Sequence, residues 1–75
     1  MKNLEVAEIL NELADYLEFS TDQKDRFKIR AYRKAALLIE GLSEDIEQLW
    51  KENRLEDLPG IGEGIAKKID EFLKT

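Results

Sequence analysis

Apolar residues recur every three to four positions through most of this chain, and this spacing restricts it to helices. In residues 4–18 one side of the predicted helix is apolar and the opposite side is acidic. Asn3 is suited to cap the first turn of this helix, and the turn-forming segment 19–22 is suited to end it. The apolar positions of the segment are Val6, Ile9, Leu10, Leu13, Ala14 and Leu17.

Three further helices are expected downstream. One runs over residues 26–40 and ends at Gly41, and a shorter one follows Ser43, which is suited to cap it. After a turn through Leu55, a last helix covers residues 63–74. The candidate core positions of these helices are Ile29, Tyr32, Ala35, Ala36, Ile39, Ile46, Leu49, Trp50, Ile65, Ile69, Phe72 and Leu73. The pattern therefore predicts an all-α fold, a compact bundle of four short helices.

The composition narrows the possible functions. With 75 residues and 43% apolar residues, the chain has enough material for one folded domain over residues 1–75. It has no cysteine and no histidine, which excludes disulfides and every zinc site or catalytic triad built on those residues. No apolar run is long enough for a signal peptide or a membrane span. We therefore expect a soluble, monomeric protein of the cytoplasm that does not contact membranes.

The net charge of −5 argues against nucleic acid as a partner, but the charges are unevenly distributed. Residues 1–23 contain six acidic residues and one lysine, and residues 35–57 contain seven acidic and two basic residues. Between them, residues 24–34 contain six basic residues and one aspartate, so a basic segment lies inside an acidic protein. Two interpretations are open: a solvated helix face with mixed charges, or an electrostatic contact with DNA.

The segment Leu58-Pro59-Gly60-Ile61-Gly62, followed by Ala66 and Ile69, has the signature of a helix-hairpin-helix motif. Pro59 presets a turn, and the two glycines allow backbone angles and close approaches that a Cβ atom would prevent. Ile61 is expected to anchor the turn in the core. The amides after the second glycine then lie at a helix N-terminus, which favours a phosphate without reading base identity. An ordinary turn between two helices is the alternative.

Three segments together resemble the N-terminal domain of family X DNA polymerases, a domain type shared by bacterial, archaeal and polymerase-beta-type enzymes. They are residues 26–36, 58–62 and 66–73, in the same order and spacing as in that family. The resemblance implies part of a longer, nucleoid-associated polymerase that binds gapped DNA at its 5′-phosphate. It also implies 5′-deoxyribose-phosphate lyase activity in base excision repair. No trio of aspartates suited to two-metal phosphoryl transfer is present, so these residues themselves are not expected to polymerise DNA.

The resemblance also assigns DNA contacts residue by residue. Lys28, Tyr32 and Arg33 match the family's phosphate pocket, and Arg30 is close enough in sequence to add a contact. Tyr32 is suited either to a hydrogen bond with a phosphate or to a structural place in the core. The other expected contacts belong to the hairpin and the helix after it: Gly60, Ile61, Gly62, Gly64 and Lys67.

The family's lyase uses a lysine that attacks the sugar aldehyde and forms a Schiff base, followed by β-elimination of the phosphate. This nucleophile falls on Lys68, which the helical period independently places at the edge of the apolar face beside Phe72. Partial shielding from water favours a neutral, nucleophilic amine, whereas a lysine that merely covers the core edge is the alternative. The lyase needs no cofactor. The family's monovalent cation, Na⁺ or K⁺, implies backbone carbonyl ligands at Leu58 and Ile61.

Three positions depart from the family's phosphate pocket. Phe27 stands in place of a histidine, and Glu56 and Gly64 stand in place of two lysines. An acidic residue near a phosphate weakens the binding of that phosphate. Because of these three departures from the family, three functions are open. They are a lyase domain, a non-catalytic helix-hairpin-helix tether of a polymerase or structure-specific nuclease, and a protein-interaction module. A DNA affinity that falls with salt separates the first two from the last.

Overall fold

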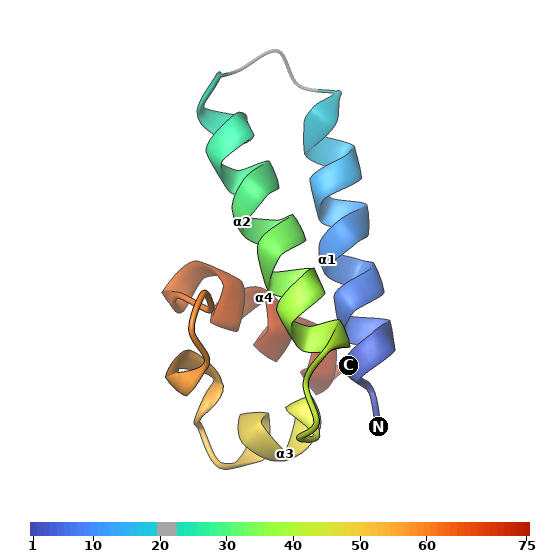
Figure 1. Cartoon of the computed structure of the whole chain (residues 1–75), viewed down its shortest axis with the longest axis vertical. Coiled ribbons are helices and arrows are strands. Elements are labelled where there is room, and N and C mark those ends of the chain that lie inside the picture. The colour runs from blue at the N-terminus through green and yellow to red at the C-terminus, as the bar shows by residue number, and fades with distance from the viewer. Residues whose placement is uncertain (20–22) are drawn as a thin grey trace.

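In the computed structural model, which describes residues 1–19 and 23–75, the chain consists of helices joined by short connections (Figure 1). The elements are α1 (Asn3–Glu18), α2 (Gln23–Glu40), α3 (Ile46–Lys51), the short 3₁₀ helix η1 (Leu55–Asp57) and α4 (Glu63–Lys74). The predicted all-α fold with four helices is therefore confirmed. Within the described ranges, no helix has the length and apolar composition needed to cross a membrane.

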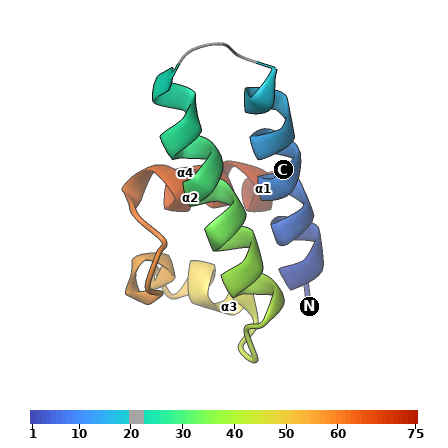
Figure 2. The ribbon, with the colours of Figure 1, turned by 45° about the horizontal axis from the view of Figure 1, so that its top comes forward.

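α1 and α2 form an antiparallel hairpin, and α4 crosses one face of this hairpin in both views (Figure 1 and Figure 2). α3 lies near the end of the hairpin at which α1 begins and α2 ends (Figure 1). All four helices, η1 and the connection before α4 contribute side chains to one core. The buried members of this core are Val6, Ala7, Leu10, Ala35, Ala36, Ile39, Ile46, Leu49, Leu55, Ile61, Ile65, Ile69 and Leu73.

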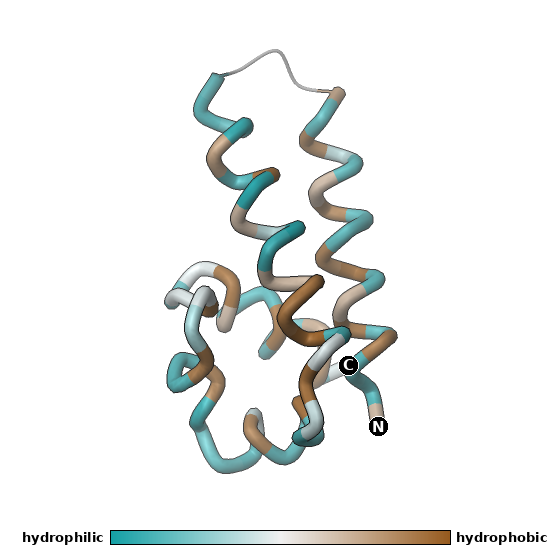
Figure 3. The backbone as a smooth tube through the Cα atoms, viewed as in Figure 1, coloured by the Kyte–Doolittle hydropathy of each residue, from teal (hydrophilic) through white to brown (hydrophobic). Residues whose placement is uncertain are grey.

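The first half of α2 differs from its second half. Its buried residues begin only at Ala35, so the turns before Ala35 extend beyond the buried core. These turns are mostly hydrophilic, whereas the last turns of α2 are apolar (Figure 3). The basic segment 24–34 thus belongs to a helical arm on which every basic side chain except that of Arg33 is exposed.

Asn3 does not cap α1, in contrast to the prediction. Lys2 occupies the N-cap position without a capping side-chain hydrogen bond, and Asn3 is 4% exposed in the first turn. Its Nδ2 donates to the carbonyl oxygen of Glu44 at 2.7 Å, and its Oδ1 accepts from the amide of Ile46 at 2.8 Å. The prediction was wrong because capping rules consider only neighbours in sequence, whereas folding brings the loop before α3 against α1.

Two helix starts also differ from the expected positions. α3 begins after Asp45, whose side chain accepts from the Glu47 amide at 3.0 Å, and not after Ser43. Both residue types are good N-caps, and the hydrogen bond from Ile46 to Asn3 selects the later start. α2 already begins at Gln23 rather than at residue 26. The expected turn residues 20–22 lie outside the described part of the chain.

Candidate nucleic-acid interface

The connection between η1 and α4 contains the glycine hairpin, residues 58–62. Gly60 has a φ of +91°, a conformation that is strained for any residue with a Cβ atom. The amide of Ile61 donates to the Leu58 carbonyl at 3.1 Å, and Ile61 is 4% exposed. The turn is therefore closed by its own backbone and anchored in the core by one side chain.

Gly62 differs from Gly60, although the sequence predicted special backbone angles for both. Its φ of −89° and ψ of −177° are extended, and a Cβ atom there would meet nothing within 4 Å. Gly62 is the N-cap residue of α4 and has no side chain with which to cap that helix. A Cβ atom on Gly64 would also meet nothing within 4 Å. The start of α4 is thus open to close approach by the backbone of a ligand.

A recess of about 200 Å³ lies between the first half of α2 and the start of α4. Its wall is mostly apolar, with one cationic side chain. We call it the α2–α4 recess, and its lining residues are Phe27, Lys28, Ala31, Tyr32, Gly64 and Ile65. Three expected DNA contacts, Lys28, Tyr32 and Gly64, therefore lie around one recess. Tyr32 is half-buried and packs against the core, so it has a structural role whatever it binds.

Lys68 follows Gly64 by one helical turn, so the two residues share one side of α4. The Lys68 side chain is 46% exposed, and its Nζ lies 3.9 Å from Oε2 of Glu71. It stands next to the buried residue Ile69, at the edge of the apolar face. The expected nucleophile is thus half-shielded, on the side of α4 that borders the recess.

The comparison with known families accords with this geometry. Residues 1–75, the whole chain, match the family model described as a helix-hairpin-helix domain. The chain belongs to this family. Helix-hairpin-helix domains generally bind DNA, so DNA binding is the general function of this chain. No curated protein and no solved structure matches it.

The basic residues of α2 are not equivalent in this helix-hairpin-helix domain. Arg33 donates hydrogen bonds to Asp15 at 2.7 Å and to Glu18 at 2.5 Å, both on α1. These bonds, first to Glu18 and then to Asp15, raise the pKa of the guanidinium above its ordinary value. In the absence of DNA, Arg33 therefore links α2 to α1 through these two ion pairs. The basic side chains of α2 that are exposed between residues 25 and 34 are Arg26, Lys28, Arg30 and Lys34.

Lys67 is on another side of α4 from Lys68. It lines a second cleft of about 380 Å³, between α4 and the segment after α3, together with the carboxylates of Glu56 and Glu63. With Asp70, three acidic side chains line this cleft and oppose a phosphate, so this side of the helix-hairpin-helix domain is less suited to DNA than the recess. The structure therefore separates Lys67 from Lys28, Tyr32 and Gly64, with which the sequence grouped it.

Trp50 lines the same cleft and is half-buried. Its indole Nε1 donates to Oδ1 of Asp70 at 2.7 Å, and Nζ of Lys74 lies 2.9 Å from Oδ2 of that carboxylate. The hydrogen bond from Trp50, followed by that from Lys74, lowers the pKa of Asp70. Trp50 thus joins α3 to α4, in line with the structural role expected for it.

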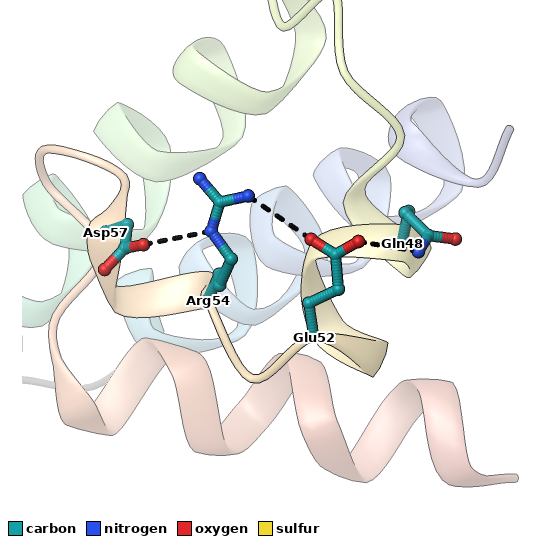
Figure 4. Close-up of polar contacts among 4 residues, drawn as sticks. All are labelled: Gln48, Glu52, Arg54 and Asp57. Carbon is teal, nitrogen blue, oxygen red and sulfur yellow. Dashed lines mark hydrogen bonds and ion pairs between the residues drawn. The ribbon is translucent and has the colours of Figure 1, made fainter.

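A polar network that the sequence did not point to precedes the glycine hairpin (Figure 4). Arg54 Nε donates to Asp57 at 3.2 Å, and its Nη1 donates to Glu52 at 3.3 Å. Glu52 also accepts from Gln48 at 2.8 Å, and this bond, followed by that from Arg54, lowers the pKa of Glu52. The network links α3 to η1 across Asn53, which has a φ of +57°. The close spacing of acidic residues around one arginine is the sequence signal for it.

Proposed function

We propose that this helix-hairpin-helix domain binds gapped DNA at the 5′-phosphate side of the gap, as the N-terminal domain of a family X DNA polymerase. The observation that supports this most directly is the α2–α4 recess. Its two borders are the exposed basic arm of α2 and the open start of α4. Both are suited to phosphate, through cationic side chains on one border and helix amides on the other.

The contacts available on these borders are mainly to the DNA backbone. Lys28 and Arg30 supply exposed cations, and the amides after Gly62 supply uncharged donors. Such contacts position DNA without reading its sequence. The acidic cleft around Glu56 and Glu63 would repel the same backbone, which orients the domain on its ligand. We therefore expect binding that depends on the shape of the gapped DNA and not on its sequence.

We further propose that Lys68 is the nucleophile of a 5′-deoxyribose-phosphate lyase. Its neutral Nζ would attack C1′ of the open sugar, and loss of water would form the imine. Removal of a C2′ proton would then break the C3′–O bond and leave a 5′-phosphate on the downstream strand. Hydrolysis of the imine would return the free amine. The place of Lys68 one turn after Gly64, on the side that borders the recess, supports this role.

A monovalent cation is a further part of the proposal. The carbonyl oxygens of Leu58 and Ile61 would hold it, and it would supply positive charge at the turn. The Leu58 carbonyl already accepts a hydrogen bond from the Ile61 amide at 3.1 Å. A carbonyl oxygen has two lone pairs, so this bond leaves one of them for Na⁺ or K⁺.

A non-catalytic tether is the second candidate, and two observations favour it. Lys68 is paired with Glu71 at 3.9 Å, and its side chain is only about half-shielded. Phe27 and Gly64 also bring no charge to the recess in which the resemblance implies a 5′-phosphate. Under this alternative the domain would bind DNA in the same orientation and leave the sugar intact.

Two measurements test the proposal in order. If about three phosphates are neutralised, the affinity for gapped DNA should fall roughly 20- to 40-fold between about 50 and 200 mM salt. A flat response would refute DNA binding at this surface. Borohydride trapping on gapped DNA with a 5′-deoxyribose phosphate then separates the two candidates. An adduct that disappears in Lys68→Ala and persists in Lys67→Ala establishes the lyase, and no adduct despite binding establishes the tether.

A further inference from the structure

The acidic cleft lies on another side of α4 from the α2–α4 recess, and the proposed function places no ligand in it. Its volume of about 380 Å³ is within the usual range of ligand sites in proteins. One wall is a stripe of α4 that begins at Glu63 and ends at Asp70, and the other wall includes Trp50 of α3 and Glu56 of η1. The cleft is thus large enough to hold a side chain of another molecule, beside three carboxylates and one indole ring.

The carboxylates of the acidic cleft are not neutralised by the domain itself. The side chains of Glu56 and Glu63 form no hydrogen bond or ion pair with the described part of the chain. Arg54, the cation nearest to Glu56 in sequence, is bonded instead to two carboxylates outside the cleft (Figure 4). Among the described residues, the lining contains one basic side chain, that of Lys67, against three acidic ones, which leaves a net charge of −2. The cleft therefore favours a cation from outside the domain.

The walls of the cleft indicate which kind of cation fits. Within residues 1–19 and 23–75, no three acidic side chains are placed to hold a metal ion, so a cation that reaches carboxylates on both walls must be larger. Trp50 lines the cleft, and the bond from its indole Nε1 to Asp70 holds the ring in place. A guanidinium is planar, stacks on an indole face and donates several hydrogen bonds to carboxylates, whereas an ammonium is a compact point charge. The lining is therefore best matched by an arginine side chain.

We infer that the acidic cleft receives an arginine side chain of a partner protein, stacked on Trp50 and paired with Glu56 and Glu63. The four arginines of this chain all lie within the described residues, and none of them lines the cleft. DNA cannot take this place, because the same carboxylates repel its backbone. Since the cleft and the recess are on different sides of α4, the partner and DNA can be bound at the same time. The inference does not rest on the DNA contacts proposed above.

Trp50 makes the test direct, because it is the only tryptophan of the chain and lines the cleft. Its fluorescence is followed while the domain is titrated with capped glycine peptides that contain one central arginine, lysine or citrulline. Citrulline keeps the shape of arginine and removes its charge. Wild type should bind the arginine peptide about threefold more tightly than the lysine peptide and about tenfold more tightly than the citrulline peptide.

Glu56→Gln/Glu63→Gln should lose most of the preference for arginine over citrulline. Glu5→Gln/Glu8→Gln, which removes the same charge from α1, should keep it, and circular dichroism should show the wild-type fold in both variants, because all four side chains are exposed. Equal affinity of wild type for the arginine and citrulline peptides, or an unchanged preference in Glu56→Gln/Glu63→Gln, would overturn the inference. A wild-type dimer in sedimentation that Glu56→Gln/Glu63→Gln dissociates would also overturn it, because an arginine of a second copy would then occupy the cleft.

Discussion

The guanidinium of Arg33 donates a hydrogen bond of 2.7 Å to the carboxylate of Asp15, across the α1–α2 hairpin. Glu18 accepts a second bond from the same group, so one of the basic residues of α2 is neutralised by two acids of α1. All three side chains are substantially exposed, and exposed ion pairs contribute little to stability. A DNA phosphate would therefore compete with Asp15 and Glu18 for Arg33.

Removal of both carboxylates should make Arg33 available to DNA. In Asp15→Asn/Glu18→Gln, the slope of log affinity against log salt should steepen by about 0.9, the contribution of one more phosphate contact. The control is Glu5→Gln/Glu8→Gln, which changes the net charge equally on exposed residues of α1. Identical slopes for the two variants would show that Arg33 stays out of contact with DNA.

The two glycines of the hairpin should respond to substitution in opposite ways. Gly62→Val should keep the helical circular dichroism, because the backbone is extended and a Cβ atom there meets nothing within 4 Å. It should lose about tenfold or more in DNA affinity, because valine covers the amides at the start of α4. Gly60→Ala should lower the free energy of unfolding by about 1–2 kcal/mol, because φ is +91° there. Unchanged affinity in Gly62→Val would place the DNA contact elsewhere.

Asn3→Ala should destabilise the fold. The substitution leaves the amide of Ile46 and the carbonyl of Glu44 without their buried partner, at an expected cost of about 1–3 kcal/mol. For a domain of this size, the melting temperature should fall by about 4–8 °C for each kcal/mol. Asn11→Ala, a half-exposed asparagine on the same helix, is the control. Equal melting temperatures for the two variants would contradict the role of Asn3 as a link between α1 and α3.

The Trp50–Asp70 hydrogen bond should make stability depend on acid pH. Because the bond lowers the pKa of Asp70 in the folded state, its contribution is present above the ordinary value of 3.8. It is lost as the pH falls through the lower folded value. Trp50 is the only tryptophan, so its fluorescence follows unfolding at each pH. Asp70→Asn should lose this component of the acid response, and Glu12→Gln, an exposed acid on α1, should retain it.

Most of the helical structure was predictable from the sequence, because the period of apolar residues is a local property. The last helix was expected over residues 63–74 and has those bounds in the structure. The strained turn at Gly60 and the anchor at Ile61 were equally local, because both follow from backbone angles and side-chain type within five residues. The role of Gly62 was not predictable in this way. Its backbone angles are ordinary, and what matters is that it has no side chain at the start of α4.

Contacts between residues distant in sequence could not be predicted from these local patterns. A short polar residue at a helix start predicts a cap, yet Asn3 binds a loop 41 to 43 positions away. A basic residue on an amphipathic helix predicts a ligand contact, yet Arg33 meets two acids of the neighbouring helix. In both cases the side chain has several possible partners of similar strength, and the packing of the helices selects among them.

The residues along the chain were enough to define four helices, a basic segment and a helix-hairpin-helix turn, since each depends on neighbours close in sequence. The packing of α4 across the α1–α2 hairpin defined the site, because it brings Gly64 and Ile65 to Phe27 and Lys28. That packing also places Lys67, but not Lys68, in the lining of the acidic cleft. A crossing of this kind depends on how one shared core is filled by all the helices at once, and no single segment specifies it.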